Sequence, residues 1–437
     1  MQLKRYQDAV VIGFALFAMF FGAGNLIFPP VIGRDAGEGM IVALIGFLTT
    51  GVGLPLLGMI ACAKENSSFD MIARRVGYGF GNSLMVLMLL TLGPLVAIPR
   101  TAATTYELGV STLIPTASLE LTTCLYFIIV LLLVLRPSAV VDRIGKILTP
   151  ILLLVLMTII VKGVVFPIGE VVATPMTDVF STTLMEGYQT MDAMASVIFA
   201  SIIITTIRAK GYQEKRDITR VMLQAGGIAT AGLTLVYGGL MVLGSQTSGL
   251  DVASFSRTEL VLFISQTILG DIGTLLLSVT VSLACITTSV ALLSSSATFF
   301  TELCREKISY SVIVVILTLI SGLVALNDVD QIVAQASPIL SLIYPTVIVL
   351  ILITLLGSRV KNDTVIKYTV YTTVVMSLFD LLITFEIEGL SFLHSLMEKF
   401  LFYEQGFAWV LPAFIVFTVT SLATEKQKRY FYKRLPS

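Results

Sequence analysis

Polar residues that could bind an ion or a small charged molecule stand in the middle of three long apolar runs. The first run, FALFAMFFGAGNLIFPP at 14–30, carries two glycines and an asparagine. The second, at 194–206, and the third, at 282–300, carry serine and threonine hydroxyls. Neutral oxygens suit a hard cation, and free amides at a helix N-terminus suit a carboxylate. These residue types predict binding of a cation and an anionic group.

The first run predicts a broken helix. It lies in an apolar stretch at 9–32, and roughly 20 such residues span a bilayer. Gly22 and Gly24 weaken a helix, and Asn25 adds a polar group that hydrocarbon does not solvate. A helix that opens here frees carbonyls and amides, a common site design in secondary transporters. The alternative is close packing of small residues, with Asn25 in an interhelical hydrogen bond.

The residues do not indicate an enzyme, a disulfide framework or an organic cofactor. One histidine is present, His394, without an HExxH or GxSxG motif. The four cysteines, Cys62, Cys124, Cys285 and Cys304, show no paired spacing, which favours free thiols. The formal net charge is zero, so no nucleic-acid partner is expected.

Long apolar helices must hold these polar groups. The chain has 437 residues, of which 56% are hydrophobic and 13% charged, whereas soluble proteins are about 25% charged. We therefore predict an all-α polytopic membrane protein that is embedded in the lipid bilayer. Twelve apolar segments lie near 9–32, 40–63, 84–107, 118–135, 144–166, 188–207, 221–244, 270–300, 309–326, 333–356, 366–386 and 407–424. The segment 386–406 is amphipathic.

Basic residues predict the orientation of the chain. With twelve spans, 23 of the 28 Lys and Arg residues fall on the side that holds both termini, and 4 fall on the opposite side. Cytoplasmic loops of membrane proteins carry an excess of positive charge, so both termini are predicted to be cytoplasmic. The predicted location of the protein is the cell membrane. Arg100 alone falls inside a span, where it either faces a partner or cavity or snorkels to the surface. Glu107 is too far along the same helix to pair with it directly.

The string GAGNLIFPP at 22–30 resembles the signature of the branched-chain amino acid:cation symporter family. It is similar, more distantly, to the GLGN-containing first helix of the leucine-transporter fold. The resemblance implies about twelve helices in a 5+5 inverted repeat, with helices 1 and 6 broken. The repeats would cover 1–166 and 186–357, and 358–437 would add two helices and a basic cytoplasmic tail.

The resemblance also implies an ion site. ACITTSVA at 284–291 is similar to the AGLTSSIA of the leucine-transporter fold, in which an alanine carbonyl and two hydroxyls bind sodium with carbonyls of the first helix. The implied Na⁺ ligands are Ala18, Phe21, Ala284, Thr287 and Thr288. A second sodium site of some relatives needs a threonine where this chain has Met194, so one ion site is expected.

The substrate site follows from the same resemblance. SIIIT at 201–205 lies in the stretch that is similar to AIIT of the broken sixth helix, and the match points to Ser196 and Phe199. The implied substrate-binding residues are Met19, Phe20, Ala23, Gly24, Asn25, Ser196, Phe199 and Leu292. The alternative for these serines and threonines is hydrogen bonding back to their own helix.

The expected function is import of leucine, isoleucine or valine by Na⁺ symport with alternating access. The alternative is a proton-coupled transporter of the same fold. It would use a buried carboxylate, for which Asp192 and Asp380 are the candidates.

Overall fold

The computed structural model describes residues 2–135, 139–357, 360, 362–385 and 391–432, and this part of the chain is helical without strands. The first half contains α1 (Gln2–Phe20), α2 (Ala23–Ala36), η1 (Gly37–Gly39), α3 (Met40–Leu48), η2 (Thr49–Gly53), α4 (Leu54–Glu65), α5 (Phe69–Arg74), α6 (Tyr78–Leu90), η3 (Thr91–Leu95), α7 (Ala97–Thr104), η4 (Thr105–Val110), α8 (Ser111–Leu113), α9 (Leu119–Leu135) and α10 (Ala139–Val165). The second half contains α11 (Val179–Glu186), η5 (Gly187–Thr190), α12 (Asp192–Ala209), α13 (Lys215–Ser245), α14 (Arg257–Leu303), α15 (Tyr310–Val324), α16 (Val329–Leu356), α17 (Asp363–Thr384), α18 (Ser391–Met397) and α19 (Val410–Tyr432).

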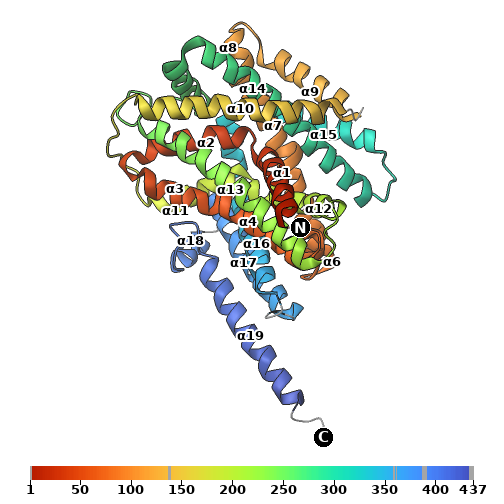
Figure 1. Cartoon of the computed structure of the whole chain (residues 1–437). Helices are drawn as coiled ribbons and strands as arrows, with labels where there is room; N and C mark the ends of the chain where they lie inside the picture. Colours follow the sequence, from red (N-terminus) through yellow and green to blue (C-terminus); the bar gives the residue numbers. More distant parts are fainter. Residues whose placement is uncertain (1, 136–138, 358–359, 361, 386–390, 433–437) are drawn as a thin grey trace.

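Each of the twelve predicted apolar segments contains helix. Within the described residues, seven helical segments are long and apolar enough to cross a membrane, and four shorter apolar helices accompany them. Figure 1 shows the helices gathered into one body, from which α19 extends toward the C-terminal end of the chain. The protein is therefore a multi-pass membrane protein.

The first helix is broken where its glycines predict. α1 ends at Phe20 and α2 begins at Ala23. Gly22 between them is extended, with φ −121° and ψ −171°. The amide of Phe21 still donates to the carbonyl of Phe17. The amide of Gly22 makes no corresponding hydrogen bond to the carbonyl of Ala18. The carbonyl of Ala18 is thus left without its backbone donor at the end of α1.

The sixth helix is also broken, but earlier than its predicted segment at 188–207 suggests. The unit starts with α11 at Val179, passes through the 3₁₀ turn η5, and continues as α12 from Asp192. Met191 separates η5 from α12 with φ +61° and ψ +9°, a left-handed conformation that is uncommon for a non-glycine residue. The predicted repeat boundary at 186 falls on the last residue of α11.

Two other long helices change direction inside the body. The third unit, from α6 to α8, contains π-helical turns at η3 and η4, and Gly93 within η3 has non-helical angles. Pro94 follows it directly, and a proline removes a helical hydrogen bond. The eighth unit, α14, turns at Gly270, where φ is +67°. The predicted start of the eighth segment, 270, falls on this kink, and α14 also includes residues 257–269 before it.

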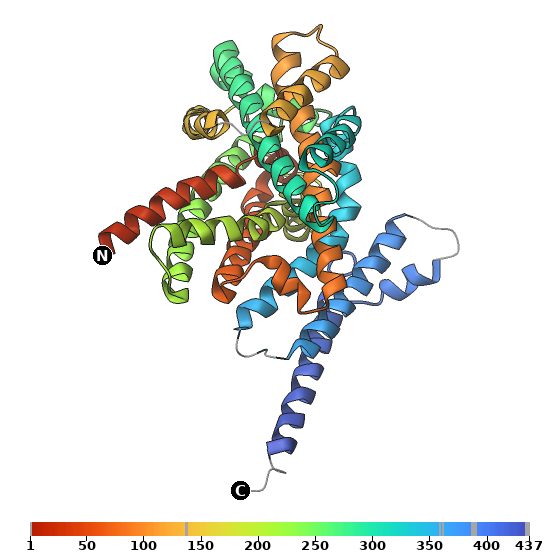
Figure 2. The ribbon, with the colours of Figure 1, turned by 90° about the vertical axis from the view of Figure 1, so that its right-hand side faces the viewer.

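Ion pairs join loops that lie far apart in the sequence. Lys210 pairs with Asp8 at 2.8 Å, Arg75 pairs with Asp363 at 2.9 Å, and Arg257 pairs with Asp330 at 2.5 Å. Figure 2 shows the N-terminal end of α1 at the edge of the body. The basic residues Arg136, Arg359, Lys361, Lys433 and Arg434 lie outside the described residues, as do the side chains of Lys4, Arg143, Lys146, Lys426, Lys428 and Arg429.

The last two long helices lie at the edge of the body. α17 packs on both α16 and α19. Of the predicted amphipathic segment 386–406, residues 386–390 lie outside the described part, and α18 occupies Ser391–Met397. The exposed face of α19 is apolar, with Phe414, Val419 and Leu422 more than half exposed, as expected of a lipid-facing helix.

Candidate functional site

Asn25 joins the two broken helices. Its side-chain amide donates to the carbonyl of Phe20 at 2.9 Å, across the break between α1 and α2. It also donates to Oδ2 of Asp192, the first residue of α12, at 2.9 Å. The hydroxyl of Tyr237, on α13, lies against the same amide and donates to Asp192 at 3.2 Å. Asn25 thus bridges the broken backbone of the first helix and also ties it to the second break by an interhelical hydrogen bond.

Close helix packing positions this junction. A Cβ at Gly244 of α13 would lie 1.9 Å from the carbonyl oxygen of Pro30 in α2, and a Cβ at Gly33 would lie 2.0 Å from that of Met241. Any side chain at these glycines would push the two backbones apart. The contact keeps α13 directly against α2, and Tyr237 on α13 is fully buried beside Asn25. Small residues have this role in many membrane helix pairs.

Arg100 lies inside the protein, between the two breaks. Its side chain is 4% exposed, which excludes the snorkelling alternative. Nη1 donates to the carbonyl of Gln189, in η5 of the sixth unit, at 2.7 Å. The guanidinium also lies over the ring of Phe28, 5.4 Å from its centroid. Nη2 approaches α2 so closely that a Cβ at Gly24 would lie 2.7 Å from it.

The predicted sodium ligands come from the two helices that face each other at the first break. A Cβ at Gly22 would lie 3.9 Å from the methyl carbon Cγ2 of Thr288, so the methyl group of Thr288 lies beside the broken backbone. The hydroxyl of Thr287 donates to the carbonyl of Ala284 at 2.9 Å and stays on its own helix. Thr288 thus lies at the break with its methyl group toward Gly22, whereas the hydroxyl of Thr287 is bonded within α14.

The predicted substrate residues separate into two groups. Ser196 lies one turn into α12, where its hydroxyl donates to the carbonyl of Ala193 at 2.7 Å. It lies against α4, with its oxygen 2.9 Å from a Cβ placed at Gly58. Phe199 and Leu292 are buried, at 6% and 8% exposure. The hydroxyl of Ser196 therefore points to a neighbouring helix, whereas Met19, Phe20, Ala23, Gly24 and Asn25 surround the first break.

Sequence reasoning missed two parts of this region. Tyr237 stands in an apolar helix with no motif around it, so no sequence signal marks it. The second part is a buried network in which Thr101 and Ser289 hydroxyls lie 2.6 Å apart and the hydroxyl of Tyr126 reaches both, at 3.1 and 2.8 Å. Ser289 belongs to the matched string at 284–291, but its partners come from α7 and α9.

Comparison with known proteins assigns the chain to a family. A family model described as branched-chain amino acid transport protein matches residues 5–427. The chain belongs to this family.

Its relatives in the family match along nearly their whole length. The chain is 36% identical to the branched-chain amino acid permease BraB of Bacillus subtilis over 425 residues, covering 94% of each protein. It is 34% identical to the branched-chain amino acid transport system 2 carrier protein of Pseudomonas aeruginosa over 418 residues, covering 93% of this chain and 94% of that one. The protein is therefore a transporter of the branched-chain amino acid class and not an enzyme.

Solved structures show the fold. Mhp1, a nucleobase-cation-symport-1 family transporter in a closed conformation with bromovinylhydantoin bound, superposes with a TM-score of 0.63 over 98% of this chain and 93% of that one, at 14% identity. A manganese transporter of Eremococcus coleocola gives a TM-score of 0.58 at 12% identity, covering 95% of each. This likeness confirms the predicted polytopic all-α class with a leucine-transporter-like fold and two broken helices.

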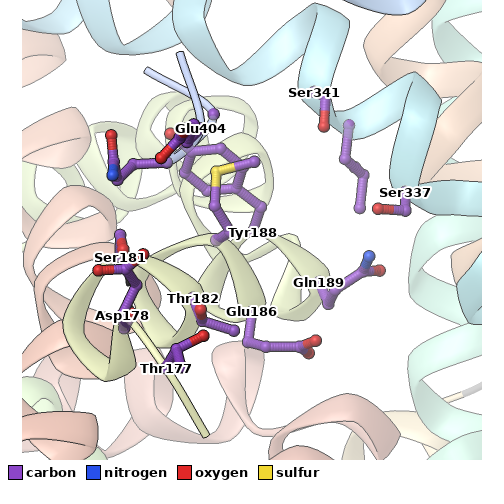
Figure 3. Close-up of a pocket in the computed structure, with 14 residues that line it drawn as sticks. Thr177, Asp178, Ser181, Thr182, Glu186, Tyr188, Gln189, Ser337, Ser341 and Glu404 are labelled. Carbon is purple, nitrogen blue, oxygen red and sulfur yellow. Dashed lines mark hydrogen bonds between the residues drawn. The ribbon is translucent and has the colours of Figure 1, made fainter. Parts of the chain in front are cut away.

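A cavity of about 410 Å³ in this family member lies next to the sixth-helix break, between α11, η5, α16 and residues 404–406. Figure 3 shows Glu186, Tyr188 and Gln189 on one side of it and Ser337 and Ser341 of α16 on another. Gln189 lines this cavity with its side chain while its carbonyl binds Arg100. The cavity therefore lies beside the junction of the two breaks. Among the described residues no His, Cys, Asp and Glu cluster could hold a transition metal.

Proposed function

We propose that this protein imports leucine, isoleucine and valine across the cell membrane by Na⁺ symport, with alternating access and both termini in the cytoplasm. The observation that carries the proposal is the extended backbone at Gly22, which opens the first helix beside the side chain of Thr288 on α14. A broken helix offers backbone oxygens to a cation and backbone amides to an anion at the same point. An amino acid and Na⁺ supply this pair of ligands.

The proposed Na⁺ site uses neutral oxygens. The carbonyls of Ala18 and Phe21 end the first half-helix, and α14 supplies the carbonyl of Ala284 with the hydroxyls of Thr287 and Thr288. In this structure the hydroxyl of Thr287 donates to the carbonyl of Ala284 at 2.9 Å. It would rotate away from this bond to bind an ion. Such a site needs no buried carboxylate, and Na⁺ would join α14 to the first helix.

The proposed substrate site lies on the other side of the break. The α-carboxylate binds the amides of Ala23 and Gly24 at the positive end of α2. The α-amine binds carbonyls of Met19 and Phe20, and the Phe20 carbonyl keeps a second lone pair beside its bond from Asn25. The branched side chain packs against Phe199 and Leu292. A pocket of this kind distinguishes one methylene by about 1–3 kcal/mol, so shared transport of the three amino acids is expected.

Proton coupling is the second candidate, because the structure contains a carboxylate at the junction. Asp192 is 4% exposed and stands at the sixth-helix break, bonded to Asn25 and Tyr237. Buried ionisable groups in membrane proteins often belong to proton relays. Asp380 lies in α17, outside this junction.

Uptake into proteoliposomes separates the two candidates. Labelled leucine is supplied with an inward Na⁺ gradient alone, and in a parallel sample with an inward proton gradient alone. Concentrative uptake with Na⁺ alone is expected. Concentrative uptake with protons alone, unaffected by Na⁺, would transfer the coupling role to Asp192.

A substitution then tests the ion site. Thr288→Ala removes a hydroxyl ligand, and hydrogen bonds or contacts to charged groups contribute roughly 1.5–3 kcal/mol, so we expect Na⁺ affinity to fall by about 10-fold or more. The measurement is the Na⁺ concentration that half-saturates leucine binding. Thr298→Ala on the same helix is the control, since Thr298 is exposed and bonds to its own helix at Ser294. Equal Na⁺ dependence in both variants would remove Thr288 from the site.

A further inference from the structure

We infer that Arg100 is the side chain that binds the substrate's carboxylate, clamping it against the N-terminus of α2. This inference rests on the proposed binding of an amino acid at the first break and adds a charged side chain to a site otherwise made of backbone. Arg100 lies on α7, in neither broken helix. It contacts both of them, through Gly24 on one side and Gln189 on the other.

The first argument is electrostatic. The N-terminus of α2 carries partial positive charge, and no side chain caps it at Gly22. A buried guanidinium placed against this end puts positive charge next to positive charge. Such an arrangement is unfavourable by itself and becomes favourable when an anion contacts both the guanidinium and the helix end.

The second argument is the unused hydrogen-bonding capacity of Arg100. Nη1 donates to Gln189, but Nε is buried and has no partner among the described residues. An unpaired buried donor is costly, and a guanidinium has a fork of donors that matches a carboxylate. Among the described residues no ion pair within 4.0 Å joins Arg100 to a carboxylate, and the buried Asp192 at the sixth-helix break is bonded elsewhere. Asp192 instead accepts bonds from Asn25 and Tyr237.

The third argument is the glycine at position 24. A Cβ there would lie 2.7 Å from Nη2 and 3.1 Å from the central carbon of the guanidinium. Gly24 is therefore the residue that admits Arg100 to the helix end. The same absence of a side chain leaves the Gly24 amide accessible to a ligand oxygen, so one glycine brings both donors to one point.

The test compares two ligands that differ in the carboxylate. Equilibrium binding of L-leucine and of L-leucinamide, in which an uncharged amide replaces the carboxylate, is measured in detergent with NaCl at neutral pH. We expect the purified wild-type protein to prefer leucine by about 10- to 150-fold, the range for a hydrogen bond to a charged group. Arg100→Gln should weaken leucine by about that factor and leave leucinamide nearly unchanged, so the preference disappears.

Arg257→Gln is the matched control. Arg257 also lies over the Phe28 ring at 5.4 Å, but its charge is paired with Asp330 at 2.5 Å. This variant should keep the wild-type preference for leucine. Arg100→Lys keeps the charge without the fork, and we expect an intermediate preference.

Two outcomes would overturn the inference. One is a folded Arg100→Gln protein that still prefers leucine as wild type does. The other, which needs no variant, is a wild-type protein that binds leucinamide as tightly as leucine. Thermal unfolding with and without Na⁺ reports folding separately. Loss of Na⁺ dependence with a retained ligand preference would reject the sodium proposal and leave the role of Arg100 in place.

Discussion

The two broken helices of this protein are opened by different means. At the first break, glycine sits in an extended conformation that every residue type can adopt, with φ −121° at Gly22. At the second, Met191 is held in the left-handed region with φ +61°, next to a 3₁₀ turn. The first break is a local property of its sequence, whereas the second depends on its surroundings. Strained backbone of the second kind persists only where neighbouring contacts hold it.

The contacts that hold the second break come from the first. Asn25 binds Asp192, which directly follows Met191, and Arg100 binds the carbonyl of Gln189, two residues before it. The first break therefore has a binding role and also fixes the shape of the second. A substrate that contacts Arg100 at the first break would act on the second through the same side chain.

The largest effect is expected at the first break. Gly24→Leu places a side chain where Arg100 already lies, and such overpacking lowers stability by roughly 1–3 kcal/mol. The leucine side chain would also fill the place that the ligand needs at this break. We expect the Kd for leucine to rise by about 100-fold or more. Calorimetric titration of purified protein provides the measurement. Gly227→Leu, at an exposed position of α13 with open space around it, should retain wild-type affinity. Normal leucine affinity in Gly24→Leu would remove the binding role of this break.

Backbone substitutions test the contrast in conformation directly. Met191→Ile should lower stability by about 1 kcal/mol relative to Met191→Leu, because a β-branched residue is disfavoured at positive φ. Gly22→Ala should change stability by less than about 0.5 kcal/mol, since its angles suit any residue and its Cβ meets Thr288 at an ordinary 3.9 Å. Ligand-free thermal unfolding of the variants provides the comparison. A larger loss of stability in Gly22→Ala than in Met191→Ile would contradict the proposed difference between the two breaks.

The smallest effect is expected within α12. The hydroxyl of Ser196 is bonded to Ala193 on its own helix and lies against Gly58 of α4. Ser196→Ala should therefore change leucine affinity by no more than about twofold, which corresponds to roughly 0.4 kcal/mol. Binding of labelled leucine is the measurement. A tenfold loss of leucine affinity with an unchanged unfolding temperature would show that Ser196 contacts the substrate. The binding region of the second broken helix would then include the first turn of α12.

The same contrast explains what the sequence predicts. Gly22, Gly24 and Asn25 are unusual inside an apolar run, so the position of the first break follows from local chemistry. The second break carries no glycine at its pivot, and its first half, α11, is only eight residues long and rich in threonine. A hydropathy pattern detects α12 and overlooks α11.

Charged residues in the interior show the same limit. The sequence places Arg100 inside a span but does not reveal its partner, because the carbonyl of Gln189 is 89 residues away. The bond between Asn25 and Asp192 joins residues 167 positions apart. These contacts arise only when the two halves of the fold pack together, and periodicity along one helix has no information about them.

Glu107 shows what such long-range contacts mean for synthesis of the protein. Its carboxylate accepts from the hydroxyl of Thr258 at 2.6 Å and from the amide of Val329, the first residue of α16, at 2.9 Å. These partners follow it by 151 and 222 residues. At about 5–20 residues per second, the ribosome produces Val329 roughly 10–45 seconds after Glu107. During that interval the third unit is already made while its carboxylate lacks both partners. Assembly of the end of the third unit that carries Glu107 must therefore wait for the second half of the chain.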